Sequence, residues 1–290
     1  MRSLTSLNPE EFEQLVFAFE KECQRLNARK TFAGEVRQRA VGAGQKGRLE
    51  ETRAKLFFIL MYFKLYPIQE AMGFFWGMSQ TRVGRWIHRL TPILQTALGR
   101  ELKLPERQPK KLHAVLRECP ELRFIIDGTD RRVRRPKDKD QQKKNYSGKR
   151  KAHTKKNVII VSGKRVVYMS QTQPGSCHDK KVAQELEGRH FPSGSMLLQD
   201  SGFLGFNPKG AEVWMPKKKP KGKPLPPWWK KINSILSSAR VAVEHVISGV
   251  KRCHIVSDIF RNFKKGFDDQ VMEAACGLHN LRSDFRSAHA

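Results

Sequence analysis

Two short apolar runs that each lead into a carboxylate constrain most strongly what this chain can fold into. Residues 122–126 (LRFII) precede Asp127, and residues 195–199 (SMLLQ) precede Asp200. A glycine-containing turn follows each acid, DGT and DSG. Both runs have the length and composition of buried strands that end at the acid. Because the ends of neighbouring strands meet at one place in a sheet, the sequence predicts that the two carboxylates lie side by side.

The pattern around these strands predicts a mixed α/β domain. Residues 157–171 read as two strands joined in a hairpin at SGKR, and residues 211–216 as a further strand. Residues 178–188 are expected to form a helix closed by Gly188, and longer helices are expected over 231–252 and 267–285. Strands, a helix, another strand and a long helix in this order predict an α/β fold with a mixed sheet.

The N-terminal part of the chain is predicted to be helical. A helix with acids in its first turn is expected from Pro9, followed by a Gly- and Arg-rich connector and three helices within residues 49–98. The charged, proline-containing stretch 100–111 has the composition of a linker. We therefore expect an N-terminal helix and basic connector over 1–48, an all-α domain over 49–105 and the α/β domain over 106–290.

The third of these helices has the features of a DNA-reading helix. Ser79 is suited to cap its N-terminus, and Val83, Ile87, Leu90 and Leu94 form an apolar stripe. Its small polar start and a separate arginine face fit a major groove, although an ordinary solvated face would show the same pattern. The expected DNA contacts are Ser79, Gln80, Thr81, Arg82, Arg85 and Arg89.

The charge balance points to nucleic acid as the partner. The chain holds 56 Lys and Arg against 28 Asp and Glu, a formal net charge of +28, and a polyanion is the partner class that such an excess favours. The longest apolar run, residues 56–63, is too short to span a bilayer. We therefore expect a soluble, intracellular protein with no membrane partner.

The cations concentrate directly after Asp127. Residues 131–156 contain 13 lysines and arginines against two aspartates, and this run is expected to follow a DNA backbone rather than to be merely solvated. The candidates are Arg131, Arg132, Arg134, Arg135, Lys149, Arg150 and Lys151. Trp228 and Trp229 stand beside seven lysines in residues 217–231, and stacking on an unpaired base and packing in the core are both open.

A third acid stands in the middle of a helical pattern. Glu244 lies in an otherwise apolar stretch, where an unpaired buried carboxylate would be costly. Arg240 precedes it by four residues and Lys251 follows it by seven, which brings both near one helix face. Two or three converging carboxylates are what Mg²⁺-assisted chemistry at a phosphodiester requires.

Five motifs in order resemble the DDE transposases of bacterial insertion sequences, in the group related to the Harbinger elements. They are IIDGTDRRVRRP, YSGKRKAHTKKNVII, PGSCHDKK, LLQDSGFLGF and RVAVEHVISGVKRCHIVSDIFRN, and the resemblance runs from about Leu49 to Arg282. It implies a ribonuclease H-like mixed-sheet catalytic domain preceded by an all-α helix-turn-helix domain. One departure is Ser237, where the family often has Tyr.

The resemblance also implies a site and an activity. Asp127, Asp200 and Glu244 would be catalytic and would bind Mg²⁺ or Mn²⁺, with two ions expected. Arg240 and Lys251 match the family's flanking cations and would contact DNA. His178 and Asp179 would lie next to the three acids without binding the metal themselves.

The implied activity is that of a DNA transposase. It would bind terminal inverted repeats, cleave at them as a metal-dependent endonuclease and transfer the strand to target DNA, as a homo-oligomer on double-stranded DNA. A domesticated relative that only binds DNA, or a structure-directed nuclease without strand transfer, are the alternatives.

Overall fold

The computed structural model describes residues 1–29, 31, 35, 36, 38, 48–219, 222 and 224–288. The chain folds into two compact units. Unit 1 comprises Met1–Leu104, Lys251–Asp258 and Lys264–Ala290, and unit 2 comprises Pro105–Val250 and Ile259–Phe263. Most of the basic connector expected before residue 48 lies outside the described residues.

Unit 1 is helical and is organised around α5 (Gln80–Arg100). This helix packs against α2 (Pro9–Arg29), α3 (Thr52–Leu65), α4 (Gln69–Trp76) and α11 (Phe267–Ala288), while the short helices α1 (Arg2–Thr5) and α10 (His254–Ser257) pack on α3. The three predicted helices of residues 49–98 are confirmed as α3, α4 and α5. The predicted apolar stripe of α5 is buried, and the Ser79 hydroxyl accepts from the Arg82 N–H as an N-cap.

The last helix belongs to unit 1 rather than to the compact unit that holds the sheet. α11 buries 13 of its residues, and its Gly277 lies where a Cβ atom would come within 3.1 Å of Leu98 in α5. An apolar face predicts that a helix is covered, but it does not predict which neighbouring element covers it. The compact unit 2 therefore ends earlier than the domain boundary expected from the sequence.

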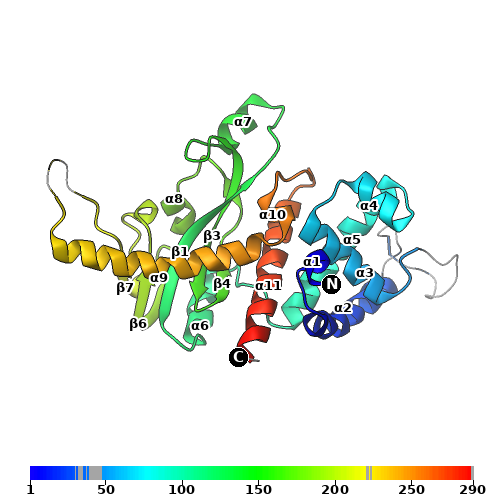
Figure 1. The fold of residues 1–290 in the computed structure, drawn as a ribbon, viewed down its shortest axis with the longest axis horizontal. Coiled ribbons are helices and arrows are strands. Elements are labelled where there is room, and N and C mark those ends of the chain that lie inside the picture. The colour runs from blue at the N-terminus through cyan, green and yellow to red at the C-terminus, as the bar shows by residue number, and fades with distance from the viewer. Residues whose placement is uncertain are drawn as a thin grey trace. The chain divides into compact units, whose positions relative to one another are not determined.

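Unit 2 contains one mixed sheet (Figure 1). Its long strands are β1 (Arg123–Arg132), β3 (Ala152–Ser162), β4 (Arg165–Met169), β6 (His190–Leu198) and β7 (Lys209–Trp214). β3 pairs antiparallel with β1 and β4, whereas β6 pairs in parallel with β1 and β7. The short strands β2 (Tyr146–Ser147) and β5 (Gln173–Pro174) also pair with β3. The predicted mixed α/β sheet, including the hairpin at Gly163, is confirmed.

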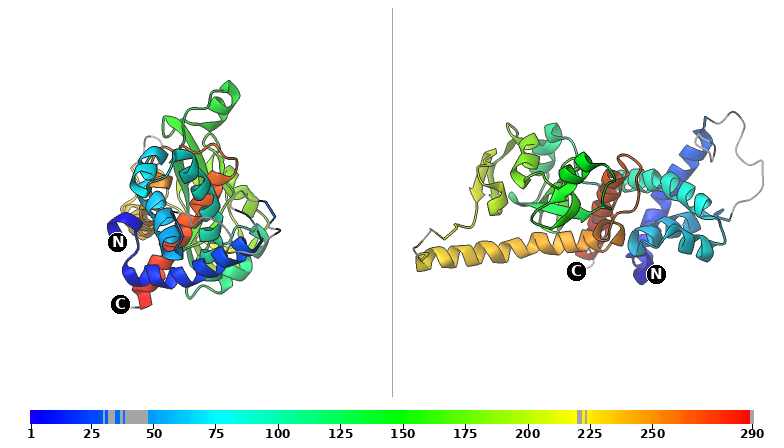
Figure 2. Two further views of the ribbon diagram at one scale, coloured as in Figure 1. Left: turned by 90° about the vertical axis from the view of Figure 1, so that its right-hand side faces the viewer. Right: turned by 90° about the horizontal axis from the view of Figure 1, so that it is seen from above.

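Helices cover both faces of this sheet (Figure 2). Phe124 and Ile126 of β1 share a buried cluster with residues of α6 (Leu112–Arg117) and α8 (Asp179–Ala183). The alternate residues of β1, which include Asp127, point to the opposite face, and α9 (Pro227–Lys251) crosses that face in Figures 1 and 2. Single 3₁₀ turns occur at Pro109–Lys111, Gln184–Leu186 and Ser201–Phe203.

The strand that carries Asp127 is longer than predicted. β1 continues five residues past the acid to Arg132, because β3 provides an antiparallel partner along its whole second half. The connection to β3 contains α7 (Lys139–Asn145), which stands away from the rest of the sheet in Figure 1. Asp127 is therefore in the middle of a strand and not at its end.

The helices of the described residues include none with the length and apolar composition of a membrane span.

A matched pair of glycines in the helix-turn-helix tests this packing. At Gly73 of α4 a Cβ atom would lie 2.5 Å from the Met78 carbonyl oxygen, whereas at Gly84 of α5 it would lie 3.1 Å from the tip of the Gln69 side chain. We expect Gly73→Ala to lower the free energy of unfolding by about 2 kcal/mol. Gly84→Ala should be neutral or gain up to about 1 kcal/mol of helix propensity. Urea unfolding followed by circular dichroism measures both, and equal effects would contradict the tight turn.

Candidate active site

The register of two parallel strands brings Asp127 and Asp200 together. Arg123 of β1 lies opposite Met196 of β6, and Ile125 lies opposite Leu198. Asp127 and Asp200 each follow that last pair by two residues, so both continue the same register. Because side chains two residues apart on a strand point to the same face, both acids start from the face that α9 covers. The predicted juxtaposition of these two strands is present.

The surroundings of Asp127 shift the pKa of its carboxyl group. Burial raises the pKa of the Asp127 carboxyl, and the nearby Asp200 and Asp179 carboxylates raise it further. The Gly128 N–H, which donates to Asp127 Oδ1 at 2.8 Å, and the Arg240 guanidinium act in the opposite direction. The net shift is upward, so the protein holds this carboxylate in a place where its charge is disfavoured.

Asp200 is oriented by the turn that follows it. Its Oδ1 atom accepts from the Gly202 N–H at 2.7 Å, at the start of the 3₁₀ turn Ser201–Phe203. The side chain of Asp200 is only half-buried. The DGT and DSG motifs therefore act alike, since in each a backbone N–H close behind the acid fixes one carboxylate oxygen.

A third carboxylate, that of Asp179, fills the space beside both glycines. A Cβ atom at Gly128 would lie 2.6 Å from Asp179 Oδ1, and a Cβ atom at Gly202 would lie 3.0 Å from Asp179 Oδ2. Asp179 begins α8, so it approaches from the sheet face opposite α9. Only glycine at both positions allows this approach. His178, the other residue of the HD pair, is exposed.

Lys156 neutralises Asp179. Its ammonium lies 2.9 Å from Asp179 Oδ1 and donates to the Cys177 carbonyl at 2.9 Å. The side chain of Lys156 is buried, because it precedes Val158 by two positions in β3 and so shares the α8-facing side of the sheet. Sequence reasoning included Lys156 only in the basic run, although its alternation with the apolar residues of β3 was a usable signal.

Arg240 approaches the acids from the other side. One of its terminal guanidinium nitrogens lies 3.9 Å from Asp200 Oδ2, and it lowers the pKa of Asp127 against the effect of burial. Arg240 belongs to α9 and is half-buried. The residue expected to contact DNA therefore faces the carboxylates in this structure, where it offsets their charge.

Glu244 lies one helical turn beyond Arg240 on α9 and on a similar side of the helix. Its side chain is exposed, so the expectation of a buried and costly carboxylate was wrong. Within the described ranges, no three His, Cys, Asp or Glu side chains are arranged around a common metal position. The role of Glu244 as the third ligand therefore stays a prediction.

Most of the other expected DNA contacts are on the surface of their own unit. In unit 1 the exposed ones are Ser79, Gln80, Thr81, Arg82 and Arg85. In unit 2 they are Arg132, Arg134, Arg135, Lys149, Arg150 and Lys151. Lys251 is half-buried at the end of α9. Contact of these side chains with DNA is untested.

Two arginines differ from the expectation. Arg131 is 3% exposed and donates to Asn157 Oδ1 at 2.8 Å and to Thr172 Oγ1 at 3.0 Å, so it holds strands together and does not face a phosphate. Arg89 is half-buried and donates to Asn27 Oδ1 at 2.8 Å near the end of α2. Helical spacing predicts that Arg89 shares the arginine face of α5, but its guanidinium is hydrogen-bonded to Asn27 of α2 instead.

The tryptophan pair is at the start of α9 and away from the core. Trp228 is 57% exposed and its ring centroid lies 4.5 Å from that of Trp229. Lys217 Nζ lies over the Trp229 ring, 4.5 Å from its centroid. Packing in the core is therefore wrong for Trp228, and its stacking on an unpaired base stays a prediction.

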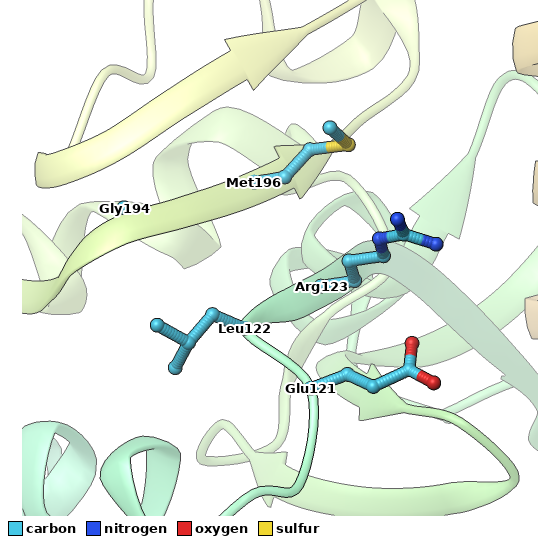
Figure 3. A pocket seen from close by; sticks show the side chains of 5 residues that line it. All are labelled: Glu121, Leu122, Arg123, Gly194 and Met196. Atoms are coloured by element: carbon cyan, nitrogen blue, oxygen red, sulfur yellow. The ribbon is translucent and has the colours of Figure 1, made fainter.

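A pocket of unit 2 lies apart from the acids. It has a volume of about 350 Å³ and is lined by Glu121, Leu122, Arg123, Gly194 and Met196 (Figure 3). Arg123 precedes Asp127 by four residues along β1, which corresponds to roughly 13 Å. The pocket thus lies near the beginning of β1, and the carboxylates lie further along the strand.

Comparison with protein families decides the class of this fold and site. The model of the DDE superfamily endonuclease matches residues 126–280, more than half of the chain, and the model of the helix-turn-helix of the DDE superfamily endonuclease matches residues 47–100. The chain belongs to the DDE superfamily endonucleases. The matched ranges contain Asp127, Asp200 and Glu244, and α4 and α5 form the helix-turn-helix of the second match.

One relative extends the comparison to most of the chain. The probable transposase for insertion sequence element IS702 of Microchaete diplosiphon is 27% identical over 237 residues, which is 81% of this chain and 81% of that protein. No solved structure matches the chain. The resemblance seen in the sequence is therefore confirmed at the level of the family, as is the α/β fold with an N-terminal helix-turn-helix.

The endonuclease family implies divalent metal ions, and the acids fit them in part. Asp127 and Asp200 offer the hard oxygen ligands that Mg²⁺ prefers. Burial first, and the Asp200 and Asp179 carboxylates after it, raise the pKa of Asp127, and a bound cation would offset this cost of its ionised form. Asp179 is committed to Lys156. The described residues thus provide a pair of candidate ligands, and Glu244 of α9 stays the predicted third.

The close approach of Asp179 to Gly128 can be tested by a compensating substitution. We expect Gly128→Ala to displace the carboxylate, weaken its ion pair with Lys156 and lower the free energy of unfolding by about 2 kcal/mol. Asp179→Ser in the same chain should recover part of that loss, giving a coupling of about 1 kcal/mol in a double-mutant cycle. Gly148→Ala is the control, since nothing lies within 4 Å of its Cβ position. Strict additivity would show that the two side chains do not compete for space.

The raised pKa of Asp127 predicts a pH-dependent cost in the metal-free protein. A folded-state pKa above the unfolded value means that ionisation destabilises the fold, so the cost is absent below about pH 4 and grows as pH rises through the folded-state pKa. In EDTA, Asp127→Asn should therefore be more stable than the wild type at pH 7, and the two should converge near pH 4.

Chemical unfolding at several pH values measures this difference, and Asp140→Asn in the exposed part of α7 is the control. Addition of Mg²⁺ should stabilise the wild type and leave the Asp127→Asn protein unchanged. An Asn variant that is less stable than the wild type at pH 7 would contradict the assigned environment.

Proposed function

We propose that this chain is the transposase of a bacterial insertion sequence. It recognises the terminal inverted repeats of its own element, cleaves DNA at the element's ends and joins the freed 3′-hydroxyl to target DNA. The observation that carries the proposal is the shared register of β1 and β6, which places Asp127 and Asp200 next to each other in a DDE endonuclease fold. The printed description of the relative, a probable transposase, supports the same activity.

The three acids have one role in this proposal. Asp127, Asp200 and Glu244 would hold Mg²⁺ or Mn²⁺, two ions in all, and the bound ions would stabilise charge on the attacking and leaving oxygens. Glu244 is exposed on α9, one turn from Arg240, so it is on the helix that already reaches the pair. The DGT and DSG turns orient the two aspartates through the Gly128 and Gly202 N–H groups.

The cations of the chain divide between the site and the DNA. Arg240 limits repulsion between Asp127 and Asp200 before DNA is bound, and Lys156 does so for Asp179. The exposed part of the basic run, from Arg132 to Lys151, would follow the phosphate backbone beside the site. The first turn of α5, with Arg82 and Arg85, would enter the major groove of the terminal repeat.

The proposed activity also implies the partners of the chain. Both ends of an element must be cut, so we infer that two or more copies of the chain act together on double-stranded DNA. Such a complex would operate at the nucleoid of a bacterial cell. The net charge of +28 favours association with DNA over long distances at low salt.

Conservative substitution of each acid tests the proposal. We expect Asp127→Asn, Asp200→Asn and Glu244→Gln each to lower Mg²⁺-dependent cleavage of labelled element ends at least about a hundredfold, because a lost metal ligand costs more than the loss of an outer partner. Binding to the same DNA should remain within about threefold of the wild type, because these substitutions leave the DNA-facing cations intact. Cleavage gels and fluorescence anisotropy measure the two effects on the same preparations.

Asp140→Asn, which removes an exposed acid from α7, should change neither property. Retained cleavage in any of the three site variants would remove that acid from the assignment. Cleavage by the wild type without joining to a target duplex would identify a nuclease, and DNA binding without cleavage would identify a DNA-binding relative.

A further inference from the structure

Two adjacent phenylalanines at the end of α4 are exposed to an extent that folding does not explain. Phe74 is 85% exposed and Phe75 is 66% exposed, and their rings meet edge to face with centroids 6.0 Å apart. Each ring leaves a large apolar area in water, where burial would be worth about 25 cal/mol per Å². Neighbouring exposed aromatics of this size mark a contact surface more often than chance.

The pair belongs to the turn of the helix-turn-helix. Gly77, in the left-handed conformation with φ 58°, ends α4, and Ser79 caps α5 two residues later. The Met78 N–H donates to the Gly73 carbonyl at 2.9 Å, which closes the turn tightly. The rings therefore stand on a rigid support, only a few residues from the exposed first turn of α5.

The surroundings of this turn are cationic. Glu70, exposed on α4 one helical turn before Phe74, is the one acid of residues 69–100, against two exposed arginines at the start of α5. Arg82 and Arg85 are exposed on α5, and a Cβ atom at Gly77 would lie 3.1 Å from a terminal nitrogen of Arg48, so a third guanidinium lies over the turn. A surface with this charge fits a polyanion.

We propose that Phe74 and Phe75 are a second DNA-reading element, which packs on the 5-methyl groups of thymines beside the bases reached by α5. This inference rests on the proposed function, since it assigns a sequence preference to the same helix-turn-helix. Duplex DNA combines what the surface offers, because it presents apolar thymine methyls in the major groove next to phosphates. Apolar side chains read those methyls directly, and cations hold the backbone on either side.

A second copy of this chain fits the surface less well. Symmetric pairing through the phenylalanines would bring Arg82 and Arg85 of each copy toward the same residues of its partner, and like charges in an interface are costly. Glu70 is the one acid of residues 69–100 and can balance only one of the two arginines in each copy. Charge complementarity therefore selects DNA over self-association.

The test compares two duplexes with the full-length protein. One duplex covers the footprint of the protein on the DNA that flanks its gene, and the other has uracil in place of every thymine in that footprint. Uracil differs from thymine only by the absent methyl group, so the wild type should bind the uracil duplex about fourfold more weakly for each methyl contacted. The double variant F74A/F75A should bind the thymine duplex at least about tenfold more weakly and should no longer distinguish the two duplexes.

Phe17→Ala is the matched control, because Phe17 is a phenylalanine of unit 1 that is 62% exposed and lies on α2, outside the helix-turn-helix. It should bind both duplexes as the wild type does. All three substituted side chains are exposed, so the variants should keep the wild-type melting temperature.

The outcomes separate this inference from the proposed function. R82A/R85A should weaken binding to both duplexes by a similar factor, which tests the helix-turn-helix itself. If that variant loses binding while F74A/F75A still prefers thymine, the phenylalanine contact is overturned and the DNA-binding role stands. If F74A/F75A changes the mass of the protein in light scattering but not its DNA affinity, the surface binds protein and the proposal is wrong.

Discussion

The parallel pairing of β1 with β6 is the constraint on which the rest of the structure depends. It places two aspartates in one register, and the repulsion between them has to be offset within the fold. Arg240 on α9 offsets the charge of this pair, and Lys156 on β3 offsets that of the neighbouring Asp179, so both cations come from elements distant in sequence. A sheet with helices on both faces allows cations to approach from two sides without occupying the space between the acids.

The acids and the cations beside them form a charged cluster rather than part of an apolar core. Burial alone disfavours the ionised form of Asp127, and a fold selected only for stability would place an apolar residue there. The backbone N–H of Gly128 and the turn at Gly202 hold the oxygens in place despite that cost. The protein therefore stores an unfavourable charge at the position where a bound cation would be most stabilising.

Local patterns predicted much of this structure. The apolar period of α5, the capping hydroxyl of Ser79 and the hairpin at Gly163 depend on neighbouring residues, and all were confirmed. Asp127 and Asp200 could be singled out because an acid after an apolar strand is locally unusual. The family resemblance then supplied the order of the motifs, which no single pattern contains.

The errors share a physical cause, which is that a distant partner decided the outcome. β1 runs past Asp127 because β3 pairs with it, and Arg131 can be buried because Asn157 and Thr172 accept hydrogen bonds from its guanidinium. The guanidinium of Arg89 donates to Asn27 at the end of α2. Glu244 is exposed although its neighbours are apolar, because α9 buries only a narrow stripe of its surface.

The carboxylate that presses on two glycines has a consequence for the evolution of such chains. Positions 128 and 179 compete for one volume, so neither can change freely while the other keeps its present size. Substitutions there should arise in pairs among descendants, a larger residue at one position accompanied by a smaller one at the other.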